Sequence, residues 1–173
     1  FPQLGLAMDE GSLEERRQNT ERLFRALAYP PRPTTVHIHR TLVDAVESWI
    51  RWNNLENARV GIQRPAPFEF IAAAVKCGCE IMLLPRDPED FFAAPLNECA
   101  AILLSQPSRV DGFYYPDETY EAFLEKIAAQ SSALVLSEES NSLFTLNEVP
   151  PGQIKPRPRE GRHFVVKSLY PAL

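Results

Sequence analysis

Short apolar runs, separated by segments of helical periodicity, constrain the fold of this chain more than any other feature. Runs that favour strands lie at residues 35–38, 59–62, 80–84, 100–104, 133–136 and 163–167. They lack the strict alternation of a half-exposed strand, and helix-forming segments separate most of them. This order predicts an α/β fold, a mainly parallel sheet with helices on both faces in three α/β/α layers.

Helices are expected where apolar side chains recur on one helical face, at residues 12–28, 42–52, 68–75 and 116–130. Ser12 and Glu15 form a capping-box pattern at the start of the first of these helices. Residues 85–95, rich in Pro, Asp and Phe, predict a loop. Residues 150–159 hold four prolines and predict an exposed loop.

Length and charge narrow the class of protein. With 173 residues, 45% of them apolar, the chain can bury a real core. We expect an N-terminal helix and linker at residues 1–33 and one α/β domain at residues 34–173. The net charge of -5 gives no general attraction to nucleic acid or to an anionic membrane. No apolar run approaches the roughly 20 residues of a membrane-spanning helix, so we expect a cytoplasmic protein that binds neither.

The three cysteines are Cys77, Cys79 and Cys99. Their odd number and the short Cys-x-Cys spacing favour reduced thiols in an intracellular protein. A Cys-x-Cys pair could offer thiolates to a metal ion, but no second pair accompanies it, so no metal site is expected.

Three short segments each follow an apolar run in the second half of the chain. They are Gln-Pro-Ser-Arg-Val-Asp-Gly at residues 106–112, Ser-Glu-Glu-Ser at 137–140 and Ser-Leu-Tyr-Pro at 168–171. Their order and spacing resemble the Asn-Pro-x-Asn-Pro-Thr-Gly, Asp-Glu-x-Tyr and Ser-x-Ser-Lys motifs of the class I/II aminotransferases. Those are pyridoxal-phosphate enzymes of fold type I. The resemblance covers about residues 34–173 and implies the large domain of that family.

Pyridoxal phosphate needs a lysine amine for its Schiff base and a carboxylate to keep its pyridine nitrogen protonated. By the resemblance, the lysine position is Pro171, which has no amine, and the carboxylate position is Ser137. Lys167 lies four residues before Pro171, about 13 Å along a strand, and does not simply replace the lysine. Glu138 is adjacent to Ser137, but consecutive strand residues face opposite ways.

The remaining cofactor positions also differ from the family. The asparagine that binds the ring hydroxyl corresponds to Arg109, and the glycine of the phosphate-binding turn corresponds to Thr41. The stacking aromatic corresponds to Pro67, beside Phe68. Ser168 alone keeps the identity of a phosphate ligand. Thr41, Arg109, Ser137 and Ser168 are therefore expected as vestigial cofactor-binding positions, with no catalytic residue.

The resemblance implies a degenerate aminotransferase-like domain, non-catalytic and without bound cofactor. Its role would be structural, dimerising or ligand-binding within a larger protein. A small anionic ligand could contact Arg40, Arg109 and Ser168, and a homodimer is expected from the family alone. The alternative is a pyridoxal-phosphate-dependent aminotransferase whose lysine is misaligned here or lies outside this segment.

Family members continue past the lysine with an antiparallel strand, between the first and last strands identified here, and then a small domain. The chain ends at Leu173, so the domain is expected to be incomplete. Three explanations stay open: an excised segment, a rearranged strand pairing, or a partner that completes the sheet.

Overall fold

A computed structural model of the chain describes residues 39–139 and 162–166, together with Glu15 and Gln18. The chain divides into two compact units, Phe1–Ile38 and His39–Leu173, and every element below belongs to the second. The strand expected at residues 35–38, the loop expected at 150–159 and nearly all of the helix expected at 12–28 lie outside the described residues.

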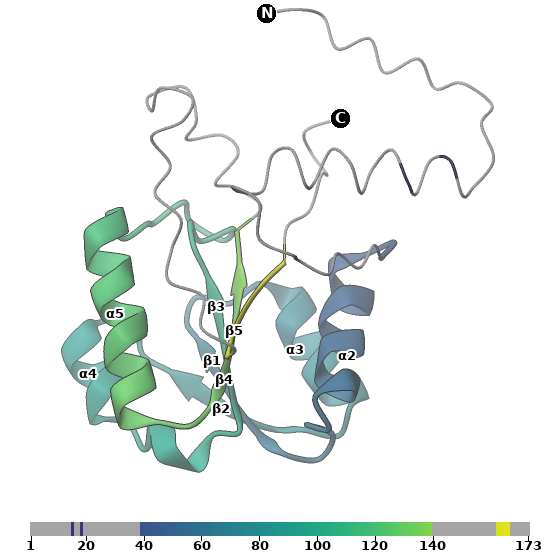
Figure 1. Cartoon of the computed structure of the whole chain (residues 1–173), viewed down its shortest axis with the longest axis horizontal. Coiled ribbons are helices and arrows are strands. Elements are labelled where there is room, and N and C mark those ends of the chain that lie inside the picture. Colours follow the sequence, from purple (N-terminus) through teal and green to yellow (C-terminus); the bar gives the residue numbers. More distant parts are fainter. Residues whose placement is uncertain (1–14, 16–17, 19–38, 140–161, 167–173) are drawn as a thin grey trace, which may run out of the picture. The chain divides into compact units, whose positions relative to one another are not determined.

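A five-stranded sheet forms the centre of the described unit (Figure 1). Its strands are β1 (Arg59–Gln63), β2 (Glu80–Leu84), β3 (Ala101–Ser105), β4 (Leu134–Glu138) and β5 (His163–Val166). The strand order is β2-β1-β3-β4-β5, and every neighbouring pair is parallel. The predicted parallel sheet is confirmed.

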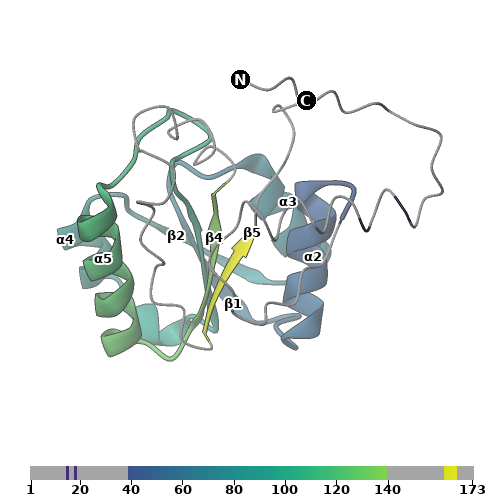
Figure 2. The same cartoon turned by 45° about the horizontal axis from the view of Figure 1, so that its top comes forward.

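Helices cover both faces of this sheet, as Figures 1 and 2 show from two directions. They are α2 (Leu42–Trp52) and α3 (Phe68–Lys76) on one face, and α4 (Pro88–Ala93) and α5 (Asp117–Gln130) on the other. A single 3-10 turn, η1 (Leu96–Glu98), precedes β3. The three α/β/α layers are therefore confirmed.

Two separate apolar cores lie on the two faces. Val46 and Ile50 of α2 pack with Leu103 and Leu136 on one face. Phe91 of α4 and Ile127 of α5 belong to the cluster on the other, with Ile102 and Val135. Neighbouring strand residues thus contribute to opposite cores, which explains why these strands are apolar without alternation.

Helix α4 corrects the expectation of a loop at residues 85–95. Asp87 caps this helix, because its carboxylate accepts hydrogen bonds from the backbone N–H groups of Glu89 and Asp90, and Pro88 occupies the first helical position. An Asp cap followed by Pro is a strong helix-start signal. The six-residue helix is too short to show the periodicity on which the sequence analysis relied.

Candidate functional site

Open α/β sheets bind ligands at the carboxyl edge of their strands, and the motif segments of this chain follow strands. The loop after β3 follows Ser105, and β4 ends at Glu138. The dark blue start of α2 lies at the same edge in Figure 1. The three described candidate positions are therefore near this edge, but the structure gives each a different environment.

Ser105 and Glu138 join the ends of β3 and β4. The Ser105 hydroxyl donates to a carboxylate oxygen of Glu138 at 2.9 Å and accepts from the backbone N–H of Arg109 at 3.1 Å. Both side chains face α2 and α3, since Leu103 and Leu136, two residues earlier in each strand, lie in that core. Burial of a carboxylate is costly unless hydrogen bonds compensate it, and Ser105 supplies one.

Two carboxylates are buried in succession at this point. Glu138 has 0% and Glu139 1% of its surface exposed, and the backbone N–H of Glu139 donates to the carbonyl of Val166 in β5 at 2.9 Å. By the resemblance, the carboxylate position of the motif is Ser137. In the structure, the carboxylate on the α2 and α3 face is one residue later. No signal in the sequence indicates this, because Ser105 and Glu138 become neighbours only through the register of the folded sheet.

Ser137 faces the other way and is fully buried. Its hydroxyl lies 2.7 Å from the Tyr120 hydroxyl of α5 and 2.6 Å from Nε2 of His163 in β5. The structure therefore separates Ser137 from the face that carries Ser105 and Glu138. Its hydroxyl links helix α5 to strand β5 across β4.

Arg109 lies in the loop after β3, and its guanidinium is already engaged. Nη1 is 3.4 Å from a carboxylate oxygen of Glu69 in the first turn of α3. Both side chains are partly exposed, so this ion pair is worth little by itself. The carboxylate of Glu69 nevertheless partly neutralises the positive charge with which Arg109 would attract an anionic ligand.

The loop that carries Arg109 is closed by its own hydrogen bonds. The backbone N–H of Ser108 donates to the carbonyl of Phe113 at 2.7 Å, and that of Gly112 donates to the carbonyl of Ser108 at 2.9 Å. Gly112 has a φ of 73°, a conformation that favours glycine. The conformation of the turn is therefore a sufficient reason for a glycine at residue 112.

Asp111 and Arg86 fasten this loop to the segment after β2. Their side chains form an ion pair, and the hydrogen bond from Arg86, followed by that from Ser108, lowers the pKa of the Asp111 carboxyl. The guanidinium of Arg86 also lies 4.6 Å from the ring centre of Phe113. The guanidinium of Arg86 is therefore already paired with groups of the domain itself.

Thr41 is the N-cap of α2. Its hydroxyl accepts a hydrogen bond from the backbone N–H of Asp44 at 3.0 Å, with Thr41 itself in an extended conformation. The exposed Arg40 precedes it. A threonine cap is a sufficient structural reason for this residue. At the start of α3, Pro67 is the N-cap residue and the neighbouring Phe68 is exposed.

Ser168, Pro171 and Lys167 lie outside the described residues. Within the described part, the lysines are Lys76 and Lys126. Lys76 ends α3, 3.5 Å from a carboxylate oxygen of Glu47, and Lys126 lies on α5, 4.1 Å from the ring centre of Phe92. Neither stands at the carboxyl edge, so the described edge does not supply the amine that pyridoxal phosphate needs.

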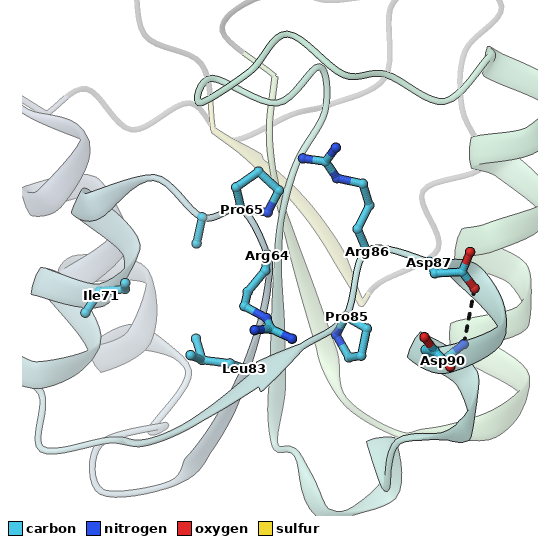
Figure 3. Close-up of a pocket in the computed structure, with 9 residues that line it drawn as sticks. Arg64, Pro65, Ile71, Leu83, Pro85, Arg86, Asp87 and Asp90 are labelled. Carbon is cyan, nitrogen blue, oxygen red and sulfur yellow. Dashed lines mark hydrogen bonds between the residues drawn. The ribbon is translucent and has the colours of Figure 1, made fainter.

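A hollow that was not expected from the sequence lies at the carboxyl ends of β1 and β2 (Figure 3). Arg64 is central in the view, with Ile71 and Leu83 on one side and Pro85 and Asp90 on the other. Arg-Pro and Pro-Arg pairs directly after two adjacent strands were the available signal. Apolar residues make up most of the lining, and Arg64, Arg86, Asp87 and Asp90 add charged groups to it.

The described part of the chain contains neither a membrane-spanning helix nor a cluster of metal ligands. None of its helices has the length and apolar character needed to cross a bilayer. In the same residues, no group of three His, Cys, Asp or Glu side chains is arranged to hold a metal ion.

The three cysteines are Cys77, Cys79 and Cys99, and burial raises the pKa of each thiol.

Comparison with solved structures identifies the architecture. The methionine aminotransferase YbdL from Escherichia coli matches with a TM-score of 0.64 and 20% identity over 90% of this chain and 42% of the enzyme. The fold of the present chain is therefore an aminotransferase fold. An alanine aminotransferase from Pyrococcus furiosus matches with a TM-score of 0.62 and 18% identity over 92% of this chain and 42% of the enzyme. A histidinol-phosphate aminotransferase from Sinorhizobium meliloti, solved with pyridoxal-5'-phosphate, has a TM-score of 0.60 and 19% identity over 74% of this chain and 35% of that one.

The aminotransferase-like chain spans less than half the length of these enzymes. No protein-family model matches it. In sequence, it is 30% identical over 90 residues to the mouse Maestro heat-like repeat-containing protein family member 2A; the match covers 52% of this chain and 5% of the mouse protein. The suspected resemblance to fold type I aminotransferases is confirmed at the level of the fold.

Proposed function

We propose that this chain is a non-catalytic aminotransferase-like domain with a structural, dimerising or ligand-binding role in a larger protein. The observation that carries the proposal is how Thr41, Arg109 and Ser137 use their side chains. Each stands at a cofactor position by the resemblance, and each bonds to another part of the domain. Side chains that already bond within the domain are less available to hold a cofactor.

The types of these residues support the same proposal. A neutral, buried Ser137 cannot stabilise a pyridinium ion, and Pro171 cannot form a Schiff base. Arg109 is longer than the asparagine it replaces and carries a charge. Thr41 replaces the glycine of the phosphate-binding turn. These four positions with unsuitable chemistry are harder to reconcile with transamination than one.

A role within a larger protein has separate support. The enzymes of similar fold are more than twice as long as the matched part. A segment similar to half of this chain also occurs within a far longer mouse protein. Both facts suit a module that functions with further polypeptide, which would supply the remaining strand of the sheet or a second copy of the domain.

A pyridoxal phosphate titration tests the loss of chemistry. The chain is mixed with the cofactor, scanned for an aldimine absorption band, reduced with borohydride and digested for mass spectrometry. We expect no band and no stable cofactor adduct. An adduct on Lys167 that disappears in the Lys167→Ala variant would defeat the proposal, because it would identify a working Schiff-base lysine.

A working pyridoxal-phosphate aminotransferase is the second candidate, and the buried carboxylate of Glu138 favours it. This group is on the same sheet face as Ser105, at the edge where fold type I enzymes are expected to bind the cofactor. If this candidate is right, the Glu138→Gln variant should weaken cofactor binding and shift the absorption of the bound cofactor. An unchanged spectrum in this variant would count against it.

A small anion at the start of α2 is the ligand we propose for a binding role. The exposed Arg40 precedes the capped helix start, where backbone N–H groups favour negative charge. Inorganic phosphate should raise the melting temperature of the chain, and Arg40→Ala should remove the increase. Equal shifts in both proteins would contradict this role.

A further inference from the structure

Strand β2 is one edge of the described sheet, and its outer main chain is available for pairing. The backbone N–H of Glu80 donates to the carbonyl of Ala58, and that of Arg64 donates to the carbonyl of Leu84, so Glu80 and Leu84 face β1. Main-chain groups alternate along a strand, and those of Ile81 and Leu83 therefore face away from β1. Within residues 39–139 and 162–166, no strand pairs with them.

This edge lacks the usual protection against pairing. Natural edge strands carry charged residues, proline or bulges along their length. In β2 the charge is confined to Glu80, and Ile81, Met82, Leu83 and Leu84 follow without interruption. The side chain of Leu83 is 51% exposed. An apolar strand of this kind suits a covered edge better than a free one.

The hollow in Figure 3 adjoins the carboxyl end of this strand. Leu83 and Ile71 supply its apolar side, on the α3 face of the sheet. An extended segment paired with β2 would place alternate side chains on that face. The edge and the hollow are therefore parts of one continuous surface.

Arg64 gives the hollow a charge that can select a partner. Its exposed guanidinium makes no hydrogen bond or ion pair with any described residue, and the Asp90 carboxylate across the hollow is not paired with it. Arg86, by contrast, is already paired with Asp111. A carboxylate is the natural complement for Arg64, since guanidinium and carboxylate form the stronger, charge-assisted type of hydrogen bond.

We propose that the outer edge of β2 and the Arg64 hollow capture an extended acidic peptide of a partner protein. The peptide adds a strand to the sheet through the main-chain groups of Ile81 and Leu83. One apolar side chain packs on Leu83 and Ile71, and an acidic side chain pairs with Arg64. This surface is distinct from the Ser105 and Glu138 edge and does not depend on the loss of cofactor chemistry.

Fluorescence anisotropy with the full chain tests this inference. The probe is a labelled, end-capped peptide that repeats Val-Thr-Glu-Thr, so that Val and Glu fall on the same face of the added strand; its control has Lys in place of Glu. We expect the acidic probe to bind and the basic one not to. Arg64→Ala should weaken binding roughly tenfold, the usual scale of a lost charged hydrogen bond. Arg51→Ala, which removes an exposed arginine of α2, is the matched control and should have no effect.

A main-chain variant separates strand pairing from charge. Leu83→Pro removes an outward N–H and leaves the bonds between β1 and β2 in place, since proline is tolerated where an edge N–H faces outward. It should weaken the acidic probe at least as much as Arg64→Ala, with an unchanged circular dichroism spectrum. Equal binding of both probes, no binding, or binding insensitive to Arg64→Ala would overturn the proposal. So would self-association by sedimentation that Leu83→Pro abolishes, because a second copy would then cover the edge.

Discussion

The hydroxyl of Ser105 donates a 2.9 Å hydrogen bond to the buried carboxylate of Glu138, joining the ends of two adjacent parallel strands. The same hydroxyl accepts from the backbone N–H of Arg109 and so also fixes the first turn of the following loop. A single small side chain thus positions both a buried acid and the loop beside it.

Replacement of Ser105 by alanine should therefore destabilise the domain. The change leaves the fully buried Glu138 with one donor fewer, and an unsatisfied buried polar group costs about 1–3 kcal/mol. Urea denaturation measures the free energy of unfolding. In the Glu138→Gln background the same serine substitution should cost less, and an equal cost in both backgrounds would show that the two side chains are not coupled.

Removal of the Ser137 hydroxyl should also destabilise the domain, for a different reason. This hydroxyl lies between the Tyr120 hydroxyl and Nε2 of His163, so Ser137→Ala breaks the link between α5 and β5. We expect a loss of about 1–3 kcal/mol in the free energy of unfolding. Tyr120→Phe, which breaks one of the two contacts, is the comparison. A larger cost for Tyr120→Phe than for Ser137→Ala would contradict a central role of the serine.

The ion pair of Asp111 with Arg86 should make stability depend on acidic pH. Arg86 lowers the pKa of Asp111 in the folded state. Its contribution is therefore fully present above the ordinary aspartate pKa and is lost as the pH falls through the lowered value. The Asp111→Asn variant should melt below the parent chain at neutral pH, and the difference should shrink on acidification. Asp90→Asn, which removes the same charge without this ion pair, should show no such convergence.

Gly61 and Gly112 should respond differently to alanine. At Gly61 an added Cβ would lie 2.7 Å from Cδ1 of Leu84, so Gly61→Ala overpacks the core and should cost about 1–3 kcal/mol. At Gly112 an added Cβ would have no described atom beyond its chain neighbours within 4 Å, but φ is 73°, so the cost of Gly112→Ala is backbone strain of about 1–2 kcal/mol. Asparagine tolerates that conformation and should recover part of the stability at residue 112. Chemical denaturation of these three variants and of Gly61→Asn checks this; a Gly61→Asn variant more stable than Gly61→Ala would refute the distinction.

Much of the scaffold could be predicted from the sequence. Helix α2 has the predicted bounds, Leu42–Trp52, and the predicted strands within the described residues are present with small changes at their ends. These elements are long or mainly apolar, so the local sequence pattern is enough to predict them. Helix α4 was not predicted, because the sequence marks it only by the Asp87 cap and by Pro88 and not by apolar periodicity.

The site was harder to predict, because its geometry depends on which face each strand residue takes. Ser137 and Glu138 are adjacent in the sequence, and only their neighbours in the folded sheet show that one faces α5 and the other α2 and α3. The pairing of Arg109 with Glu69 likewise joins segments far apart in the chain. Motif spacing alone does not contain such contacts.

The parallel sheet separates two cores, and no buried side chain of the described residues belongs to both. Val46 of α2 and Ile127 of α5 are both fully buried, on opposite sides of that sheet. Truncations at these two residues should therefore destabilise the domain independently, with costs that add within about 0.5 kcal/mol. Each core can then change its composition through mutation without requiring a compensating change in the other.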